Sequence, residues 1–165
     1  MPLLTPQYDF HRIEEIPDDF FLQHGIRALL LDVDNTLTGD NSQEIKPEVL
    51  DWLERQRQAG LQLFVISNNR EARVAPFAGR LGLGYIADAA KPKKKVALAK
   101  MKEFGVSPQQ TALIGDQLFT DVWGANRTGM YSILTKPIDP HEEIQIVLKR
   151  YLEKIVLFFY KRREA

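Results

Sequence analysis

Short apolar runs alternate with segments of helical length along most of the chain, and this alternation constrains the fold more than any other feature. The runs cover residues 28–32, 61–67, 85–87, 111–116 and 131–135. Parallel strands need long crossover connections, and right-handed crossovers through helices build a sheet that is covered on both faces. We therefore predict an α/β fold with a small, doubly wound, Rossmann-like parallel sheet.

Proline and glycine indicate where the intervening helices begin and end. Pro47 suits the first position of a helix, and Gly60 suits the position after its last turn. A second helix is expected over 70–81, kinked or shortened by Pro76, and a third over 92–105. Ser107 begins a segment that resembles a capping box. Two further segments are an N-terminal arm, 1–25, with a short helix near 17–24, and a C-terminal helix, 141–165.

The composition excludes several classes of function. The 165 residues include 22 basic and 22 acidic side chains, so no net charge favours a nucleic-acid partner. The chain has no cysteine, which excludes disulfides, thiolate zinc sites and a cysteine nucleophile. No stretch reads as a signal peptide or as a membrane span. We expect one domain over residues 1–165, in the cytoplasm.

The first predicted strand ends in two carboxylates, Asp32 and Asp34, directly after the apolar run Leu29-Leu30-Leu31. A plain strand-ending turn would explain Asp34, because aspartate readily bonds to its own backbone. An EF-hand loop beginning at Asp32 is excluded, since Leu37 stands where that loop needs glycine and Gln43 where it needs glutamate. Ligands of open α/β sheets bind outside the carboxyl ends of the strands, which favours a functional site.

Polar side chains also follow the later strands. They are the hydroxyl of Ser67, the amides of Asn68 and Asn69, the ammonium of Lys91, and the carboxylates of Asp116 and Asp121. The carboxyl ends of parallel strands share one edge of the sheet, so we expect these groups to converge with the first two aspartates. Together they suit phosphoryl transfer.

The charge of a phosphate monoester explains why these residue types belong together. Because the ester is a dianion, a carboxylate can approach it only when a cation neutralises the repulsion. We expect Mg²⁺ on Asp32 and Asp116, with Lys91 as a point charge on the phosphoryl oxygens. Asp34 is placed to protonate the leaving group and later to activate water, and Thr36 to orient Asp34.

The ordered set of motifs resembles the haloacid dehalogenase superfamily of phosphatases, which use an aspartate nucleophile. The matching motifs are Asp32-x-Asp34-x-Thr36, Ser67, Lys91 and Gly115-Asp116-x-x-x-x-Asp121. The resemblance implies Asp32 as the nucleophile and Asp34 as the general acid and base. It further implies phosphate contacts from Ser67 and Lys91 and a Mg²⁺ ligand in Asp116, while Asp121 would bind the metal through water or hold Lys91. In all, we expect substrate contacts from Thr36, Ser67, Asn68 and Lys91, and a Mg²⁺ site built from Asp32, Asp34, Asp116 and Asp121.

The spacing of the motifs leaves no room for an inserted cap domain. Ser67 follows Asp34 by 33 residues and Lys91 follows Ser67 by 24, which the core βα units use. The chain is therefore similar to the capless type III group of the superfamily, and within it to the YqeG-type branch. That branch is related to mitochondrial phosphatidylglycerophosphate phosphatases, which implies a lipid phosphate as one candidate substrate.

Two alternatives and the role of the C-terminal helix remain open. The protein could act on small sugar phosphates or nucleotides, with a second subunit of a homo-oligomer as a lid, or it could bind a phosphorylated partner without hydrolysis. The C-terminal helix carries Leu157-Phe158-Phe159-Tyr160 ahead of Lys161-Arg162-Arg163. Such a helix packs on the core or on another subunit, or it contacts a membrane peripherally.

Overall fold

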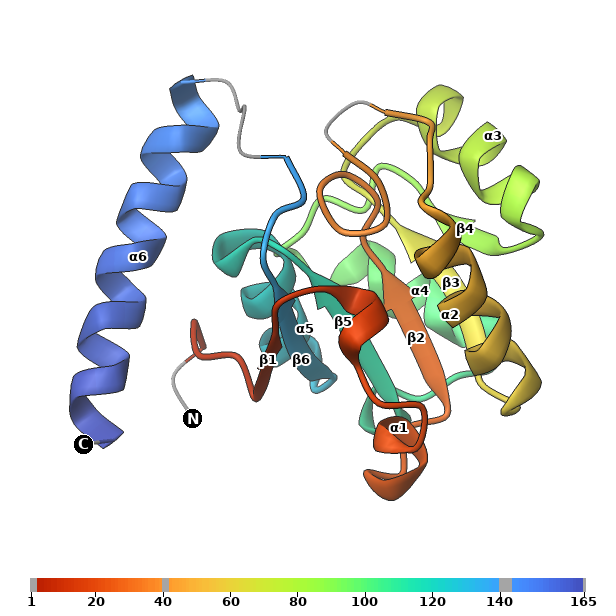
Figure 1. Cartoon of the computed structure of the whole chain (residues 1–165), viewed down its shortest axis with the longest axis horizontal. Helices are drawn as coiled ribbons and strands as arrows, with labels where there is room; N and C mark the ends of the chain where they lie inside the picture. The colour runs from red at the N-terminus through yellow and green to blue at the C-terminus, as the bar shows by residue number, and fades with distance from the viewer. Residues whose placement is uncertain (1–2, 40–41, 140–143, 165) are drawn as a thin grey trace.

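Six parallel strands form one sheet (Figure 1) in a computed structural model that describes residues 3–39, 42–139 and 144–164. The strands are β1 (Tyr8–Phe10), β2 (Ala28–Leu31), β3 (Gln62–Ile66), β4 (Gly84–Ile86), β5 (Thr111–Gly115) and β6 (Tyr131–Thr135). Their order is β1-β6-β5-β2-β3-β4, so the chain winds outward from β2 to β4 and then returns to the other side of β2. The predicted doubly wound α/β class is confirmed, and its switch point lies between β2 and β5.

Helices cover both faces of this sheet. The α-helices of the described residues are α1 (Phe20–Gln23), α2 (Pro47–Gln58), α3 (Glu71–Leu81), α4 (Lys95–Phe104), α5 (Trp123–Thr128) and α6 (Ile144–Glu164), and of these α6 lies to one side of the sheet. Leu29 belongs to a buried cluster with Trp52 of α2 and Phe77 of α3, whereas Leu30 belongs to a second cluster with Met101 of α4. Successive side chains of a strand point to opposite faces, and helices on both faces explain why the run in β2 is entirely apolar.

Proline and glycine mark the helix ends well in α2 and less well elsewhere. α2 begins at Pro47 as predicted, and Gly60 follows it with a φ of 91°, which glycine adopts readily. α3 is not shortened by Pro76, which lies inside the helix on its exposed side. α4 begins at Lys95, later than predicted, because the chain first forms a turn in which the Lys93 N–H donates to the Ala90 carbonyl.

Two local features differ from the predictions. The Ser107 side chain makes no capping bond; instead the Thr111 hydroxyl donates to the Ser107 carbonyl at 2.7 Å. The N-terminal arm holds a strand as well as the expected short helix, α1. This strand, β1, pairs in parallel with the edge of the sheet and sets Tyr8 opposite Ile133.

The intervals where a cap would be inserted hold only core elements in the described residues. α2 lies between β2 and β3, and α3 lies between β3 and β4. α6 runs along one side of the molecule, blue in Figure 1; residues 141–143 and 165 of the predicted helix lie outside the described residues. Within the described chain, no helix combines the length and the apolar character that a membrane span requires.

Candidate active site

The carboxyl ends of β2 and β5 bring two aspartates together. Leu31 pairs with Ile114 in the parallel register, and the Asp32 N–H donates to the Ile114 carbonyl at 2.9 Å. Asp116 directly follows β5. Only 8% of Asp32 and 3% of Asp116 is exposed. Since a buried carboxylate is costly without a partner, this edge of the sheet must carry positive charge.

Lys91 supplies part of that charge. Its ammonium donates to Asp32 Oδ1 at 2.8 Å and to Asp121 Oδ1 at 2.5 Å. Asn68, which follows β3, fixes the main chain of the lysine: the Lys91 N–H donates to Asn68 Oδ1 at 2.7 Å, and Asn68 Nδ2 donates to the Lys91 carbonyl at 3.1 Å. Both polar groups of Asn68 thus position the lysine, and its contact with substrate stays a prediction.

Asp121 reaches the same point from the π-helical turn Leu118–Val122. The Gln117 N–H donates to Asp121 Oδ2 at 3.1 Å. Gly115 makes room for this carboxyl group, because a Cβ at that position would lie 2.2 Å from Asp121 Cγ. The glycine ahead of Asp116 in the fourth motif is therefore required by the close approach of Asp121.

Burial shifts the pKa of each ionisable group at this edge. Burial, reinforced by the charge of Asp121, raises the pKa of Asp32 well above its usual range, and Lys91 offsets only part of the increase. Burial and Asp121 likewise raise the pKa of Asp116 to about 6, although Arg150 opposes the shift. Burial alone would lower the pKa of Lys91, but Asp121 and Asp32 outweigh it and raise that pKa. The carboxylates would therefore be stabilised by a further cation.

Three of the carboxylates could share such a cation. One oxygen each from Asp32, Asp116 and Asp121 lies within 4.8 Å of the other two. Against these three negative charges stand the ammonium of Lys91 and the guanidinium of Arg150, so one negative charge is in excess when all are ionised. Buried carboxylate oxygens with a surplus of negative charge are ligands that Mg²⁺ accepts. The residues present thus fit a divalent cation.

Arg150 reaches Asp116 from α6, and sequence reasoning missed it. Its guanidinium pairs with the Asp116 carboxylate and donates to the Asp116 carbonyl at 3.1 Å. One turn further along α6, the Glu153 carboxylate accepts a hydrogen bond from the Phe119 N–H at 3.3 Å. One face of α6 therefore contacts the loop that carries two of the grouped aspartates.

Asp34 is not one of the three grouped carboxylates. Its Oδ1 accepts a hydrogen bond from Arg73 Nη2 at 3.0 Å, and its Oδ2 accepts one from Asn69 Nδ2 at 2.7 Å. Thr36, expected to orient Asp34, has its hydroxyl 3.5 Å from Asp116 Oδ1, which is long for a hydrogen bond. The roles of Asp34 as proton carrier and metal ligand stay predictions.

The end of β3 supplies Ser67 and Asn69, and the sequence predicted no role for Asn69. Ser67 is buried, and its Oγ accepts a hydrogen bond from the Asn69 N–H at 3.0 Å. Asn69 and Arg73 together hold Asp34. A signal for them existed, because Asn69 stands in the polar stretch after β3 and Arg73 lies in the first turn of α3, next to the same strand end.

The comparisons with known proteins give the family. Residues 13–129, more than half of the chain, match the family of haloacid dehalogenase-like hydrolases. This chain belongs to that family. The hydrolase is 30% identical over 141 residues to the probable phosphatase YqeG of Bacillus subtilis, an alignment that covers 86% of this chain and 82% of that protein. The predicted phosphatase class and the YqeG-type relation are confirmed.

A second relative is longer than this hydrolase. Phosphatidylglycerophosphate phosphatase 1 of Arabidopsis thaliana is 28% identical over 96% of this chain, but the chain spans only 48% of that protein's length. Among solved structures, a HAD-like family hydrolase from Porphyromonas gingivalis superposes with a TM-score of 0.57 at 15% identity, over 77% of this chain and 98% of that one. At this identity the likeness supports the fold alone.

Proposed function

We propose that this hydrolase cleaves phosphate monoesters through an aspartyl-phosphate on Asp32, with Mg²⁺ held by Asp32, Asp116 and Asp121. The observation that carries the proposal is the buried contact of Lys91 with Asp32 beside the other two carboxylates. A nucleophilic carboxylate must be ionised while it faces a dianionic ester. Only neighbouring cations make both conditions compatible in a buried site.

In the first step an oxygen of Asp32 attacks phosphorus and the bond from phosphorus to the leaving-group oxygen breaks. The leaving-group oxygen takes a proton from Asp34. Since Lys91 contacts Oδ1 of Asp32, we assign the attack to Oδ2. Lys91 and Ser67 would hold the phosphoryl oxygens. When bound, Mg²⁺ supplies charge neutralisation for the carboxylates and the phosphoryl group.

In the second step water attacks the aspartyl-phosphate, Asp34 takes a proton from that water, and the bond between phosphorus and Asp32 breaks to release phosphate. Hydrogen bonds from Arg73 and Asn69 position the Asp34 carboxyl group. Asp34 gives a proton in the first step and takes one in the second, so the same carboxyl group serves both steps.

Two amide variants test this division of labour. Asp32→Asn should give no phosphoenzyme and no turnover, because an amide is a poor nucleophile. Asp34→Asn should still be phosphorylated by an aryl phosphate with a good leaving group but should release phosphate slowly, since water is no longer activated. Acid-quenched radiolabelling measures both outcomes, with Asp51→Asn on the exposed face of α2 as the control. Wild-type turnover by Asp32→Asn would refute the mechanism.

We infer a lipid phosphate as the substrate class, with phosphatidylglycerophosphate as the candidate. The name of the Arabidopsis relative supports it, and so does the outer face of α6. That face exposes five large apolar side chains, at positions that share one side of a helix: Tyr151, Leu152, Ile155, Phe158 and Phe159, each 42–66% exposed. Basic residues follow in the sequence at 161–163, and this combination suits an anionic membrane surface.

The double variant Phe158→Ser/Phe159→Ser tests the membrane contact. It should lose more than tenfold in sedimentation with anionic vesicles, because burial of each phenylalanine contributes about 1.5–3 kcal/mol. Turnover of phosphatidylglycerophosphate in the same vesicles should fall, while turnover of a soluble aryl phosphate should not. Leu50→Ser, at an exposed leucine of α2, is the control. Equal losses on both substrates would indicate that α6 belongs to the core or to a dimer interface.

A further inference from the structure

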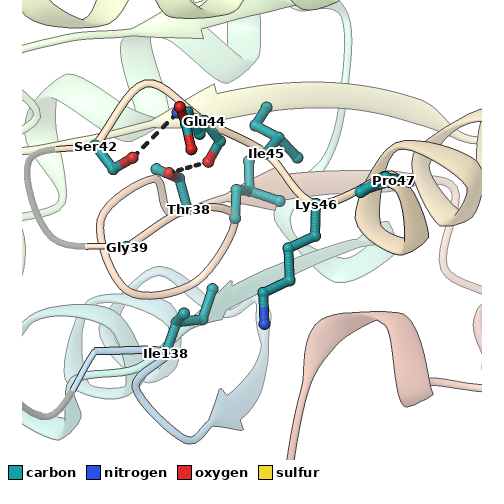
Figure 2. A pocket seen from close by; sticks show the side chains of 9 residues that line it. Thr38, Gly39, Ser42, Glu44, Ile45, Lys46, Pro47 and Ile138 are labelled. Carbon is teal, nitrogen blue, oxygen red and sulfur yellow. Dashed lines mark hydrogen bonds between the residues drawn. The ribbon is translucent and has the colours of Figure 1, made fainter.

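A pocket of about 370 Å³ lies beside the loop that follows Asp32 (Figure 2). Its walls are largely apolar and come from three parts of the chain: Leu37 from the loop, Ile45 and Pro47 from the residues that lead into and begin α2, and Ile138 from the segment after β6. Two charged residues, Lys46 and Glu44, also line it. The pocket therefore suits a ligand that is apolar on one side and charged on another.

Lys46 brings a positive charge to this pocket and Glu44 a negative one. Within residues 3–39, 42–139 and 144–164, no hydrogen bond or ion pair of the Lys46 ammonium is found. In Figure 2 this ammonium extends toward the side of Ile138, whereas Glu44 lies at the opposite end, beside Ser42. Lys46 is also the N-cap of α2, a helix of 12 residues, and the N-terminal end of the helix dipole adds to its positive potential.

The walls of the pocket are tied to the loop that carries Asp34. Thr38, which lines the pocket, forms a β-bridge with Asp34. The Ile138 N–H donates to the carbonyl of Asn35 at 3.1 Å. Main-chain hydrogen bonds thus join the walls of the pocket to the segment of Asp34, the residue that faces the leaving group in the proposed mechanism.

We propose that this pocket binds the leaving-group part of the substrate, with a second, diester-type phosphate on Lys46 and adjoining carbon chain against Ile138. The proposal rests on the proposed function, because Asp34 marks the leaving-group side. Phosphatidylglycerophosphate has this pattern: one glycerol unit separates its phosphate monoester from a phosphodiester, and acyl chains follow. Lys46 and Ile138 then select esters whose leaving group is itself an anionic phosphodiester.

Titration calorimetry with two leaving-group probes tests the pocket. The probes are glycerophosphoglycerol and dihexanoyl phosphatidylglycerol below its micelle concentration; neither carries a phosphate monoester, so neither is hydrolysed. Lys46→Met should weaken the binding of both about tenfold or more, since it removes a charged hydrogen-bond donor and keeps most of the stem. Ile138→Ala should weaken the dihexanoyl probe more than the other. Lys102→Met, at an exposed lysine of α4, should bind both like the wild type.

The binding measurements test the pocket independently of the proposed function. Lys46-dependent binding in a protein that hydrolyses no phosphate monoester would refute the mechanism and support the pocket. Equal affinities of the wild type and Lys46→Met for glycerophosphoglycerol would overturn the pocket, whatever the enzyme hydrolyses. Failure of the wild type to bind either probe at millimolar concentration would overturn it as well.

Discussion

Replacement of Lys91 by methionine should destabilise the fold strongly, because two buried carboxylates would lose the cation that they share. The side chains of Lys91, Asp32 and Asp121 are 5%, 11% and 1% exposed. Removal of one partner from a buried ion pair costs about 3–5 kcal/mol. For a chain of this length each kcal/mol lowers Tm by about 2–4 °C, so we expect a decrease of about 10 °C.

The loss should depend on pH in a defined direction. Burial already raises the pKa of Asp32, and without Lys91 that pKa must rise further. The folded variant then binds protons that the unfolded chain does not, so its stability increases as the pH falls through the raised pKa. The deficit should be larger at about pH 8 than at about pH 5. Circular dichroism melts in EDTA measure it, with Lys93→Met at an exposed lysine as the control; equal Tm values for the two variants at the higher pH would refute the reasoning.

Three further predictions concern the grouped carboxylates. Acidification from about pH 7.5 to 5.5 should weaken Mg²⁺ binding, seen as a smaller gain in Tm on adding MgCl₂, because the raised pKa of Asp116, about 6, lets protons compete with the metal. Arg150→Ala should tighten Mg²⁺ binding in calorimetry, since the guanidinium no longer occupies the Asp116 carboxylate; weaker binding would contradict this. Gly115→Ala should cost about 1–3 kcal/mol in urea unfolding, because its Cβ would meet Asp121 at 2.2 Å. Gly79→Ala, with nothing within 4 Å of the new Cβ, should be neutral or stabilising.

The sheet could be predicted from sequence because its central strands are buried on both sides. A strand such as β2, covered by helices on each face, appears as an unbroken apolar run bounded by polar residues. β1 has no such signal: it holds three residues, Tyr8–Phe10, and it is a strand because it pairs with β6 at the edge of the sheet. Its three residues take their conformation from a tertiary contact, which local propensity does not encode.

The residues of the site likewise fall into those that the sequence predicts and those that it does not. Asp32, Ser67 and Asp116 directly follow strands, so parallel topology alone brings them to one edge. Arg150 is different, because it lies 34 residues from Asp116 on a helix outside the sheet. Its position depends on how α6 lies against the molecule and on which residue faces inward. The contacts of Asn68 with Lys91 could not be predicted from the sequence for a related reason. An amide side chain after a strand can face either the cleft or the neighbouring main chain.

Within one helical turn, α6 contacts Asp116 with its inner face and exposes apolar side chains on its outer face. Binding of a surface to the outer face and binding of a metal at Asp116 should therefore depend on each other. Arg150, which pairs with Asp116, is followed in the chain by Tyr151 and Leu152, whose side chains point outward. A surface that binds those two side chains also acts on the helical turn of α6 whose Arg150 contacts Asp116. We therefore expect the proposed Mg²⁺ site to show one affinity in bulk solution and another at an interface.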